Sequence, residues 1–308
     1  MKFGGYQKPA SIHNRAAAFF GELVKKRLGA GVEFKLIGSI LDELGRPSGD
    51  LPVMVADGEL SFCYMSTVRF TEAAPELRIL ELPFVVKDRA AAYRAFDGSY
   101  GELVRTSIAK NSPFRLLGIW DNGFRYLSNS VRPIHRPEDC RGLRIRTQMS
   151  ELHGESFRAL GFEPIAVDIK EFTADIASGR FQAQDNPLTN IYNFGVHNYH
   201  PYITLTGHFY GASAMICNEA QYRSWPPEVR TAVDAAAPEA TAFQRRLAMA
   251  EDAEMLTKFD PGKVQIVRLT DSERAAFVAA LRPVLEKHRQ EFDPRLFASL
   301  AGDQVTED

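Results

Sequence analysis

The stretch Trp120-Asp121-Asn122-Gly123-Phe124-Arg125-Tyr126 closes an apolar run that begins at Phe114. The run Phe114–Trp120 is typical of a buried strand. The polar, aromatic and glycine-containing segment after it predicts a turn that delivers Arg125. Because open α/β sheets bind ligands in loops at the carboxyl ends of their strands, Arg125 is a candidate ligand contact. A surface or salt-bridging arginine is the alternative that the residue alone leaves open.

Around this stretch, segments of strand and helix period alternate, which is typical of an α/β protein. The expected strands are Lys2–Tyr6, Val32–Leu36, Leu60–Met65, Phe114–Trp120, Leu143–Arg146 and Ile203–Thr206. The expected helices are Arg15–Leu28, Leu51–Ala56, Glu151–Leu160, Phe172–Ser178, a helix opened by Pro226-Pro227 and running through Ala235, Pro238–Phe259 and Ser272–His288.

Capping residues predict where several of these helices begin and end. Asn14 and Ser150 are expected N-caps, and Gly179 is expected to end the helix before it. Pro238 is expected in the first turn of its helix, where proline is well tolerated. That helix would span about 30 Å and could bridge two lobes. The acidic tail at the end of the chain is expected to fray.

Composition narrows the classes of function. The chain has 308 residues, of which 45% are hydrophobic, so it can bury a sizeable core. Its 37 basic and 39 acidic residues give a net charge of −2. This balance argues against a nucleic-acid partner, because binding to phosphate backbones normally requires a basic excess. It leaves room for a small anionic ligand.

The cysteines and the N-terminus bear on cellular location. Cys63, Cys140 and Cys217 form no C-x-x-C pair, and each is expected to be a small apolar residue, with a disulfide left open. The segment Met1–Tyr6 has no apolar core typical of a signal peptide, and no run of about 18 apolar residues predicts a membrane span. We expect either a cytosolic protein or a chain whose signal peptide has been removed.

Common catalytic and metal signatures are absent from the sequence. It contains no G-x-G-x-x-G, P-loop, H-E-x-x-H or G-x-S-x-G motif, so we expect no cofactor and no enzyme of those classes. His197, His200 and His208 cluster loosely, but their loop context favours polar loop residues over a metal site. His208 follows an expected strand directly and could face a cleft.

Two further residues are candidate ligand contacts. Arg146 ends the expected strand Leu143–Arg146, where its guanidinium could present a rigid donor fork to a carboxylate. Asn186 precedes Pro187 in a predicted turn, and its amide can both donate and accept hydrogen bonds. A local ion pair for Arg146 and an ordinary turn residue for Asn186 are the alternatives.

The ordered set of these motifs resembles the solute receptors of tripartite ATP-independent periplasmic (TRAP) transporters, the DctP-like family. The resemblance covers nearly the whole chain. Its motifs are Leu82-Pro83-Phe84, Trp120–Arg125, Ser128-Asn129-Ser130, Arg132-Pro133-Ile134, Pro137-Glu138-Asp139, Gly142-Leu143-Arg144-Ile145-Arg146, Phe157–Gly161, Gln184–Ile191 and Leu205–His208.

The resemblance implies a two-lobed, periplasmic-binding-protein-like α/β clamshell with mixed sheets, crossing strands and a long lobe-bridging helix. Its lobes would be residues 1–124 plus 214–252 and residues 125–213 plus 253–308. The family's function is to bind a small organic acid in the periplasm and deliver it to membrane subunits of the transporter. A sensor that presents its ligand to a membrane receptor is the alternative, and an enzyme acting on a carboxylate is a third class.

The resemblance also implies roles for particular residues. Arg146 takes the position that pairs with the ligand carboxylate, with Arg125 and Asn186 as further contacts. Asp185 stands where the family usually has glutamate, and Ser66 stands where sialic-acid receptors have a cleft glutamate, which argues against that ligand. The remaining candidates are His13 and Asn14 in the first loop, the strand-end residue His208, the apolar residue Ile169, and the aromatic residues Tyr64, Trp120, Phe124 and Phe209, for which core packing is the alternative.

Overall fold

The computed structural model describes residues 1–301, which divide into two compact units. Unit 1 comprises residues 1–75, 101–122 and 212–250. Unit 2 comprises residues 76–100, 123–211 and the chain from 251 onward. Strands β4 (Phe114–Asn129) and β8 (Tyr202–Asn218) and helix α10 (Pro227–Lys258) each continue from one unit into the other. The predicted frayed tail falls largely in residues 302–308, outside the described residues.

The sheet of unit 1 has three parallel strands and one antiparallel strand beside them. Strand β1 pairs in parallel with β2 and β3, and β3 pairs antiparallel with the last part of β8. Its elements are β1 (Lys2–Gly4), α1 (Ile12–Leu28), η1 (Gly29–Gly31), β2 (Lys35–Ile37), α2 (Ile40–Glu43), α3 (Asp50–Ala56), β3 (Phe62–Ser66), η2 (Thr67–Phe70), most of α5 (Ser99–Asn111), and α9 (Glu219–Ser224).

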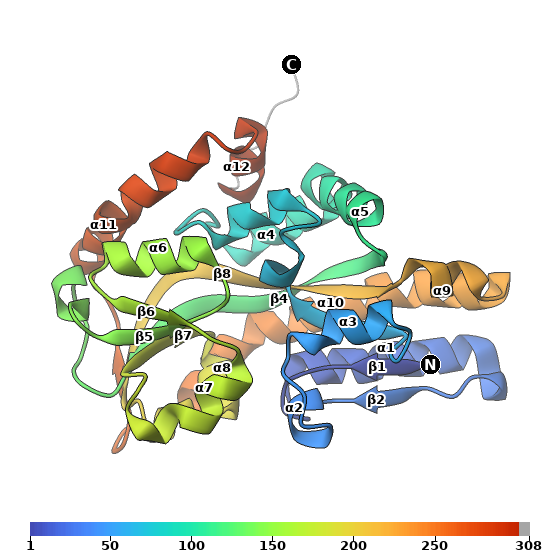
Figure 1. Ribbon diagram of the computed structural model, residues 1–308, viewed down its shortest axis with the longest axis horizontal. Helices are drawn as coiled ribbons and strands as arrows, with labels where there is room; N and C mark the ends of the chain where they lie inside the picture. Colours follow the sequence, from blue (N-terminus) through green and yellow to red (C-terminus); the bar gives the residue numbers. More distant parts are fainter. Residues whose placement is uncertain (302–308) are drawn as a thin grey trace. The chain divides into compact units, whose positions relative to one another are not determined.

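Unit 2 contains a mixed sheet in which β4 pairs antiparallel with β7, and β5 pairs in parallel with both β7 and β6. Helix α6 covers one face of these strands, and α7 and α8 lie on the other (Figure 1). Its elements are η3 (Pro75–Glu81), α4 (Arg89–Asp97), η4 (Pro137–Cys140), β5 (Arg144–Thr147), α6 (Glu151–Ala159), β6 (Glu163–Ala166), α7 (Ile169–Asp175), η5 (Ile176–Ser178), β7 (Ala183–Asn186), α8 (Leu188–Asn193), η6 (Val196–Asn198), β9 (Gln265–Val267), α11 (Asp271–Arg289) and α12 (Pro294–Ala301).

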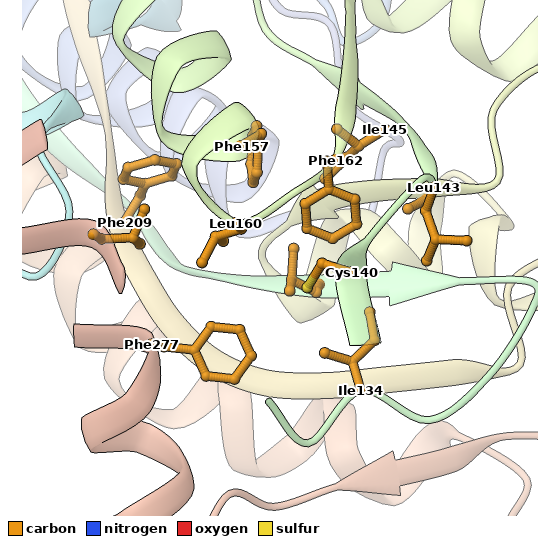
Figure 2. Close-up of a cluster of buried hydrophobic side chains, with 12 residues drawn as sticks. Ile134, Cys140, Leu143, Ile145, Phe157, Leu160, Phe162, Phe209 and Phe277 are labelled. Carbon is orange, nitrogen blue, oxygen red and sulfur yellow. The ribbon is translucent and has the colours of Figure 1, made fainter. Parts of the chain in front are cut away.

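The core of unit 2 lies between the sheet and helices α6 and α11. Leu143 and Ile145 from around β5 meet Phe157 and Leu160 from the region of α6, and Phe277 from α11 closes the cluster (Figure 2). Ile145 is opposite Ala183 in the register, so both point into this core. Arg146, next along β5, therefore points to the other face of the sheet.

Residues 76–100 belong to unit 2, whereas the predicted boundary placed them in the first lobe. Helix α4 packs against the C-terminal helix α12. The backbone N–H of Phe84 donates to the carbonyl of His208 at 2.9 Å, and both residues lie in unit 2. Helix α12, which packs against α4, had no counterpart in the sequence prediction.

The turn predicted after Trp120 was wrong, because β4 continues through that stretch to Asn129. Gly123 takes a φ of +90°, which bends the strand without ending it. Asn186 was likewise predicted in a turn, but it and Asp185 lie in β7, opposite Tyr126 and Leu127 respectively. His208 lies within β8 instead of following a strand.

Two capping predictions were also wrong. Ser11, not Asn14, caps α1: its side chain accepts from the backbone N–H of Asn14 at 3.2 Å. Pro238 lies inside α10 and does not open a new helix. The capping roles of Ser150 and Gly179 are confirmed, since Ser150 accepts from the N–H of His153 and Gly179 has a φ of +74°.

All three cysteines are buried and free. Cys63 is opposite Ile216 and Cys217 is opposite Phe62, so these two cysteines point to opposite faces of the sheet. Among residues 1–301, no helix combines the length and the apolar character that crossing a bilayer requires.

Candidate functional site

Arg146 is a buried arginine in the centre of the unit 2 sheet. It lies on β5 between β6 and β7 and is 4% exposed. Its Nε and Nη2 both donate to the carbonyl oxygen of Val167, at 3.1 and 2.9 Å. Its guanidinium also lies 5.7 Å from the ring centroid of Phe172. These contacts fix the plane of the guanidinium, which is the condition for directed pairing with an anion.

A row of amide side chains lies on the same face of the sheet as Arg146. Gln184 is opposite Arg146 in the register, and Asn186 follows it on the same face. Asn186 donates through Nδ2 to Oε1 of Gln184 at 2.6 Å and accepts at Oδ1 from Asn190 at 3.4 Å. Gln184 donates to the hydroxyl of Ser128 at 2.6 Å. The row is thus rigidly connected, and it places Asn186 in a defined orientation.

Arg125 forms a buried ion pair with Asp185. Its Nε lies 2.5 Å from Oδ2 of Asp185, and its Nη2 donates to the backbone carbonyl of the same residue at 2.6 Å. Burial alone raises the pKa of the Asp185 carboxyl, but the charge of Arg125 and contact with His208 outweigh it and hold that pKa well below its usual range. The salt-bridging alternative that the sequence left open for Arg125 is therefore observed.

His208 and Phe209 lie in the interior of unit 2. The Nδ1 of His208 lies 2.6 Å from the hydroxyl of Thr206, and its Nε2 lies 3.6 Å from Oδ2 of Asp185. Burial lowers the pKa of His208, with Asp185 acting in the opposite sense. Phe209 belongs to the hydrophobic core and stacks on His153 with ring centroids 4.2 Å apart. The core alternative therefore holds for Phe209.

The first loop of unit 1 is held by Asn14 and Tyr64. Nδ2 of Asn14 donates to the carbonyls of Gln7, Lys8 and Gly38 at 2.8–3.1 Å. The Tyr64 hydroxyl donates to Oδ1 of Asn14 at 3.0 Å and accepts from the backbone N–H of Gln7 at 3.3 Å. Both polar ends of the Asn14 side chain are occupied, and these hydrogen bonds hold the loop in place.

His13 lies against the framework formed by the first loop, Asn14 and Tyr64. Its ring centroid is 5.0 Å from that of Tyr64 and 6.0 Å from that of Trp120. Trp120 is itself fixed, because its indole N–H donates to the hydroxyl of Thr241 on α10 at 3.1 Å. All three rings are fully buried or nearly so. Unit 1 therefore holds the imidazole within a buried group of aromatic rings.

The remaining candidates occupy separate places. In unit 1, Ser66 ends β3 opposite Ser213 and is buried. In unit 2, the ring of Phe124 lies 5.2 Å from that of Tyr210, and Arg89 lies over its face. Ile169 is the first residue of α7 and is buried behind its N-cap Asp168.

The three clustered histidines do not form a common site. His197 stacks on Tyr192, whereas His200 contacts the hydroxyl of Ser128 and the carbonyl of Phe181. His208 faces Asp185 and Thr206, as described above. Within residues 1–301, no group of three or more His, Cys, Asp or Glu side chains is arranged to hold a metal ion.

Comparison with known proteins decides the family. Residues 3–291 match the DctP family, described as bacterial extracellular solute-binding protein, family 7. The chain belongs to this family. The resemblance inferred from the ordered motifs is thereby confirmed, and so is the mixed α/β fold.

Relatives of this solute-binding protein include the 2,3-diketo-L-gulonate-binding periplasmic protein YiaO of Escherichia coli. That protein is 26% identical over 91% of this chain and 84% of its own length. A TRAP periplasmic solute-binding protein of Sulfurospirillum deleyianum with bound succinate superposes with a TM-score of 0.91, at 25% identity, covering 100% of this chain and 98% of that one. One of Ralstonia eutropha with bound (S)-2-acetolactate has a TM-score of 0.88, at 25% identity, covering 98% and 97%.

Two buried polar residues of this solute-binding protein, Gln7 in unit 1 and His153 in unit 2, were not among the candidates predicted from the sequence. Gln7 is buried beside His13's loop, and its Nε2 lies 3.5 Å from Oδ1 of Asn122. His153 is buried against Phe209, and burial lowers its pKa to about 3. Both stand in segments that read as ordinary loop or helix, so only their tertiary burial distinguishes them.

Gly5 offers a test of the unit 1 framework in this solute-binding protein. A Cβ at Gly5 would lie 2.7 Å from Tyr64 and 2.8 Å from Oδ1 of Asn14, so both side chains would have to move. We expect Gly5→Ala to lower the free energy of unfolding by about 1–3 kcal/mol, measured by urea denaturation. Gly31→Ala, where a Cβ meets nothing within 4 Å, is the matched control. Equal stability of the two variants contradicts the view that Tyr64 and Asn14 are held rigidly against Gly5.

Proposed function

We propose that this solute-binding protein is a periplasmic receptor for a small organic acid and that Arg146 pairs with the ligand's carboxylate. The observation that carries the proposal is the burial of Arg146 with its guanidinium plane fixed by Val167. An arginine held in this way presents parallel N–H groups to a carboxylate at no further cost in side-chain entropy. The acids named for its relatives, succinate, acetolactate and 2,3-diketo-L-gulonate, share a carboxylate.

Neighbouring residues take graded roles in this proposal. Asn186 lies on the same face as Arg146 and is oriented by Gln184, so it is proposed as a second polar contact. Arg125 is proposed as a positioning residue, because Asp185 binds its Nε and Nη2. In unit 1, His13, Tyr64 and Trp120 are the proposed contacts, with Asn14 holding their loop. Ser66, Phe124, Ile169 and His208 remain proposals of lower priority, and Phe209 is withdrawn to the core.

Family membership supports a role in transport. We propose that units 1 and 2 are the two lobes of the receptor and that the membrane subunits of a TRAP transporter receive the acid. The ligand is released chemically unchanged, since a receptor needs only differential affinity and no acid–base step.

A screen of organic acids tests the proposal. Acids that bind the folded protein raise its melting temperature, and calorimetry then gives the affinity of each hit. Recovery of the acid after release, checked by NMR, shows whether it is unchanged. Absence of binding by every carboxylate in a panel of sugar acids, hydroxy acids, keto acids, aromatic acids and dicarboxylates contradicts the proposal, and a recovered product assigns the protein to the enzymes instead.

A further inference from the structure

Among the buried polar atoms of unit 1 that have no hydrogen-bond partner within residues 1–301, three belong to one loop and the start of the helix after it. They are Nδ1 and Nε2 of His13 and Oε1 of Gln7. His13 is 0% exposed and Gln7 is 1% exposed. A buried polar group without a partner costs about 1–3 kcal/mol, and proteins rarely leave one unmet. Three such atoms on two residues of one loop and the helix after it indicate that something other than this chain supplies their hydrogen bonds.

The framework around these atoms is built to hold them. The backbone of Gln7 is fixed from both sides, by Asn14 at its carbonyl and by Tyr64 at its N–H. The His13 ring packs against the rings of both Tyr64 and Trp120, which also contact each other. Since Asn14, Tyr64 and Trp120 have their own polar atoms paired within unit 1, the group's unmet hydrogen bonds lie on His13 and Gln7.

The chemistry of these atoms selects the partner. Burial lowers the pKa of His13 to about 3, so the imidazole is neutral at physiological pH, with one nitrogen donating and the other accepting. The free oxygen of Gln7 accepts. The Nε2 of Gln7 faces Oδ1 of Asn122, so the oxygen is the atom left without a partner. The set therefore requires groups that both donate and accept.

A hydroxyl group meets this requirement, because it has one donor and two acceptor positions. A carboxylate only accepts, so it cannot donate to the unprotonated nitrogen of His13 or to the oxygen of Gln7. A second carboxylate would also be buried against uncharged side chains, at a cost of several kcal/mol. A keto group only accepts, and an ammonium group only donates.

We infer that Gln7 and His13 bind hydroxyl groups of the ligand, so that the receptor's substrate class is hydroxylated monocarboxylic acids and not dicarboxylates. This inference rests on the proposed function, since it presumes an acid ligand, and it adds Gln7 to the specificity-determining residues. The carboxylate and the hydroxyl groups are then recognised by different residues, Arg146 for the first and Gln7 and His13 for the second.

Matched acids of equal length test the inference. D-Erythronate, butanoate and succinate share four carbons and differ in carrying hydroxyls, nothing, or a second carboxylate. D-Galactonate, hexanoate and adipate form the six-carbon set. In calorimetry we expect the hydroxylated acid to be the tightest binder of its set by at least about tenfold, because a site built to bond hydroxyls rejects analogues without them. Tighter binding of succinate or adipate overturns the inference, as does an absence of binding by both hydroxylated acids.

Variants separate this inference from the carboxylate proposal. His13→Phe and Gln7→Met keep the shape but remove the unmet atoms. We expect each to lower affinity for the hydroxylated acid about tenfold or more while leaving the melting temperature of the ligand-free protein equal or higher, because an unpaired buried polar group is lost. His197→Phe, which can stack on Tyr192 outside this region, is the control.

The outcomes are distinct. If Arg146→Ala abolishes binding of an acid whose affinity is unchanged in His13→Phe and Gln7→Met, the hydroxyl inference fails and the carboxylate proposal stands. If Arg146→Ala leaves acid binding unchanged, the carboxylate proposal itself fails. A fall in the melting temperature of ligand-free His13→Phe and Gln7→Met, with affinity preserved, assigns these residues a structural role and also overturns the inference.

Discussion

Arg146→Ala abolishes detectable binding of the organic acid while the protein remains folded. Removing one partner of a desolvated charge pair costs about 2–5 kcal/mol, because the other charge is left buried without its counterion. That corresponds to a loss in affinity of roughly 30-fold to several-thousand-fold. Calorimetry with the acid found in the screen measures the affinity, and circular dichroism with a thermal melt measures the folding.

Arg144→Ala is a matched control for this experiment. Arg144 lies two residues earlier on β5, on the same face of the sheet, and it too donates to backbone carbonyls, those of Gly179 and Arg180. Its bonds are exposed to solvent, whereas those of Arg146 are buried. We therefore expect Arg144→Ala to retain affinity. A parallel loss in both variants indicates a general effect on β5.

Arg146→Lys separates charge from geometry. Lysine keeps the positive charge but lacks the planar fork that Val167 orients in the arginine. We expect the affinity of this variant to lie between those of the wild type and Arg146→Ala. Full affinity in Arg146→Lys shows that charge alone is enough and removes the bidentate part of the proposal, whereas unchanged binding in Arg146→Ala removes Arg146 from the site.

The sequence predicted those elements whose causes are local. Ser150 caps α6 through a hydrogen bond three residues away, and Gly179 ends its segment through its own φ. Strand β5 was predicted to within one residue, because Leu143 and Ile145 alternate with the two arginines. Each of these signals acts over a few residues, so a short window contains it.

The sequence could not predict the course of β4, because residues far away in the sequence form hydrogen bonds and an ion pair with its backbone and polar side chains. Asp121 exchanges two backbone hydrogen bonds with the side chain of Gln244, more than one hundred residues away on α10. Arg125 is paired by Asp185 from β7. A stretch that reads locally as a polar turn is therefore stable as buried strand.

Helix α10 is a second case in which tertiary contacts override a local sequence signal. Proline at position 238 favours a helix start by local rules, yet α10 runs from Pro227 to Lys258 through it. Thr241, Gln244 and Arg245, in the two turns after Pro238, bond Trp120, Asp121 and Ile119 respectively. These tertiary bonds offset the intrahelical hydrogen bond that a proline removes.

Asp185→Ala and Arg125→Ala each destabilise the protein by about 3–5 kcal/mol, because each leaves its partner as an unpaired charge in the interior. Both side chains are almost completely buried, Arg125 at 2% and Asp185 at 0% exposed. Urea denaturation followed by circular dichroism measures the free energy of unfolding. Arg295→Ala, which removes an exposed pair with Asp293, is the control and should change stability by less than about 1 kcal/mol.

The double variant Arg125→Met/Asp185→Leu distinguishes the cost of an unpaired charge from the loss of packing. It removes both charges and keeps apolar volume, so we expect it to be more stable than either single alanine variant. Acid adds a second readout. The pKa of Asp185 is lower in the folded protein than in the unfolded chain, so its contribution is present above the unfolded pKa and is lost as the pH falls. The wild type should therefore lose more stability than the double variant between about pH 5 and pH 3. Equal losses, or a double variant less stable than both single variants, contradict the view that Arg125 and Asp185 stabilise each other as a buried ion pair.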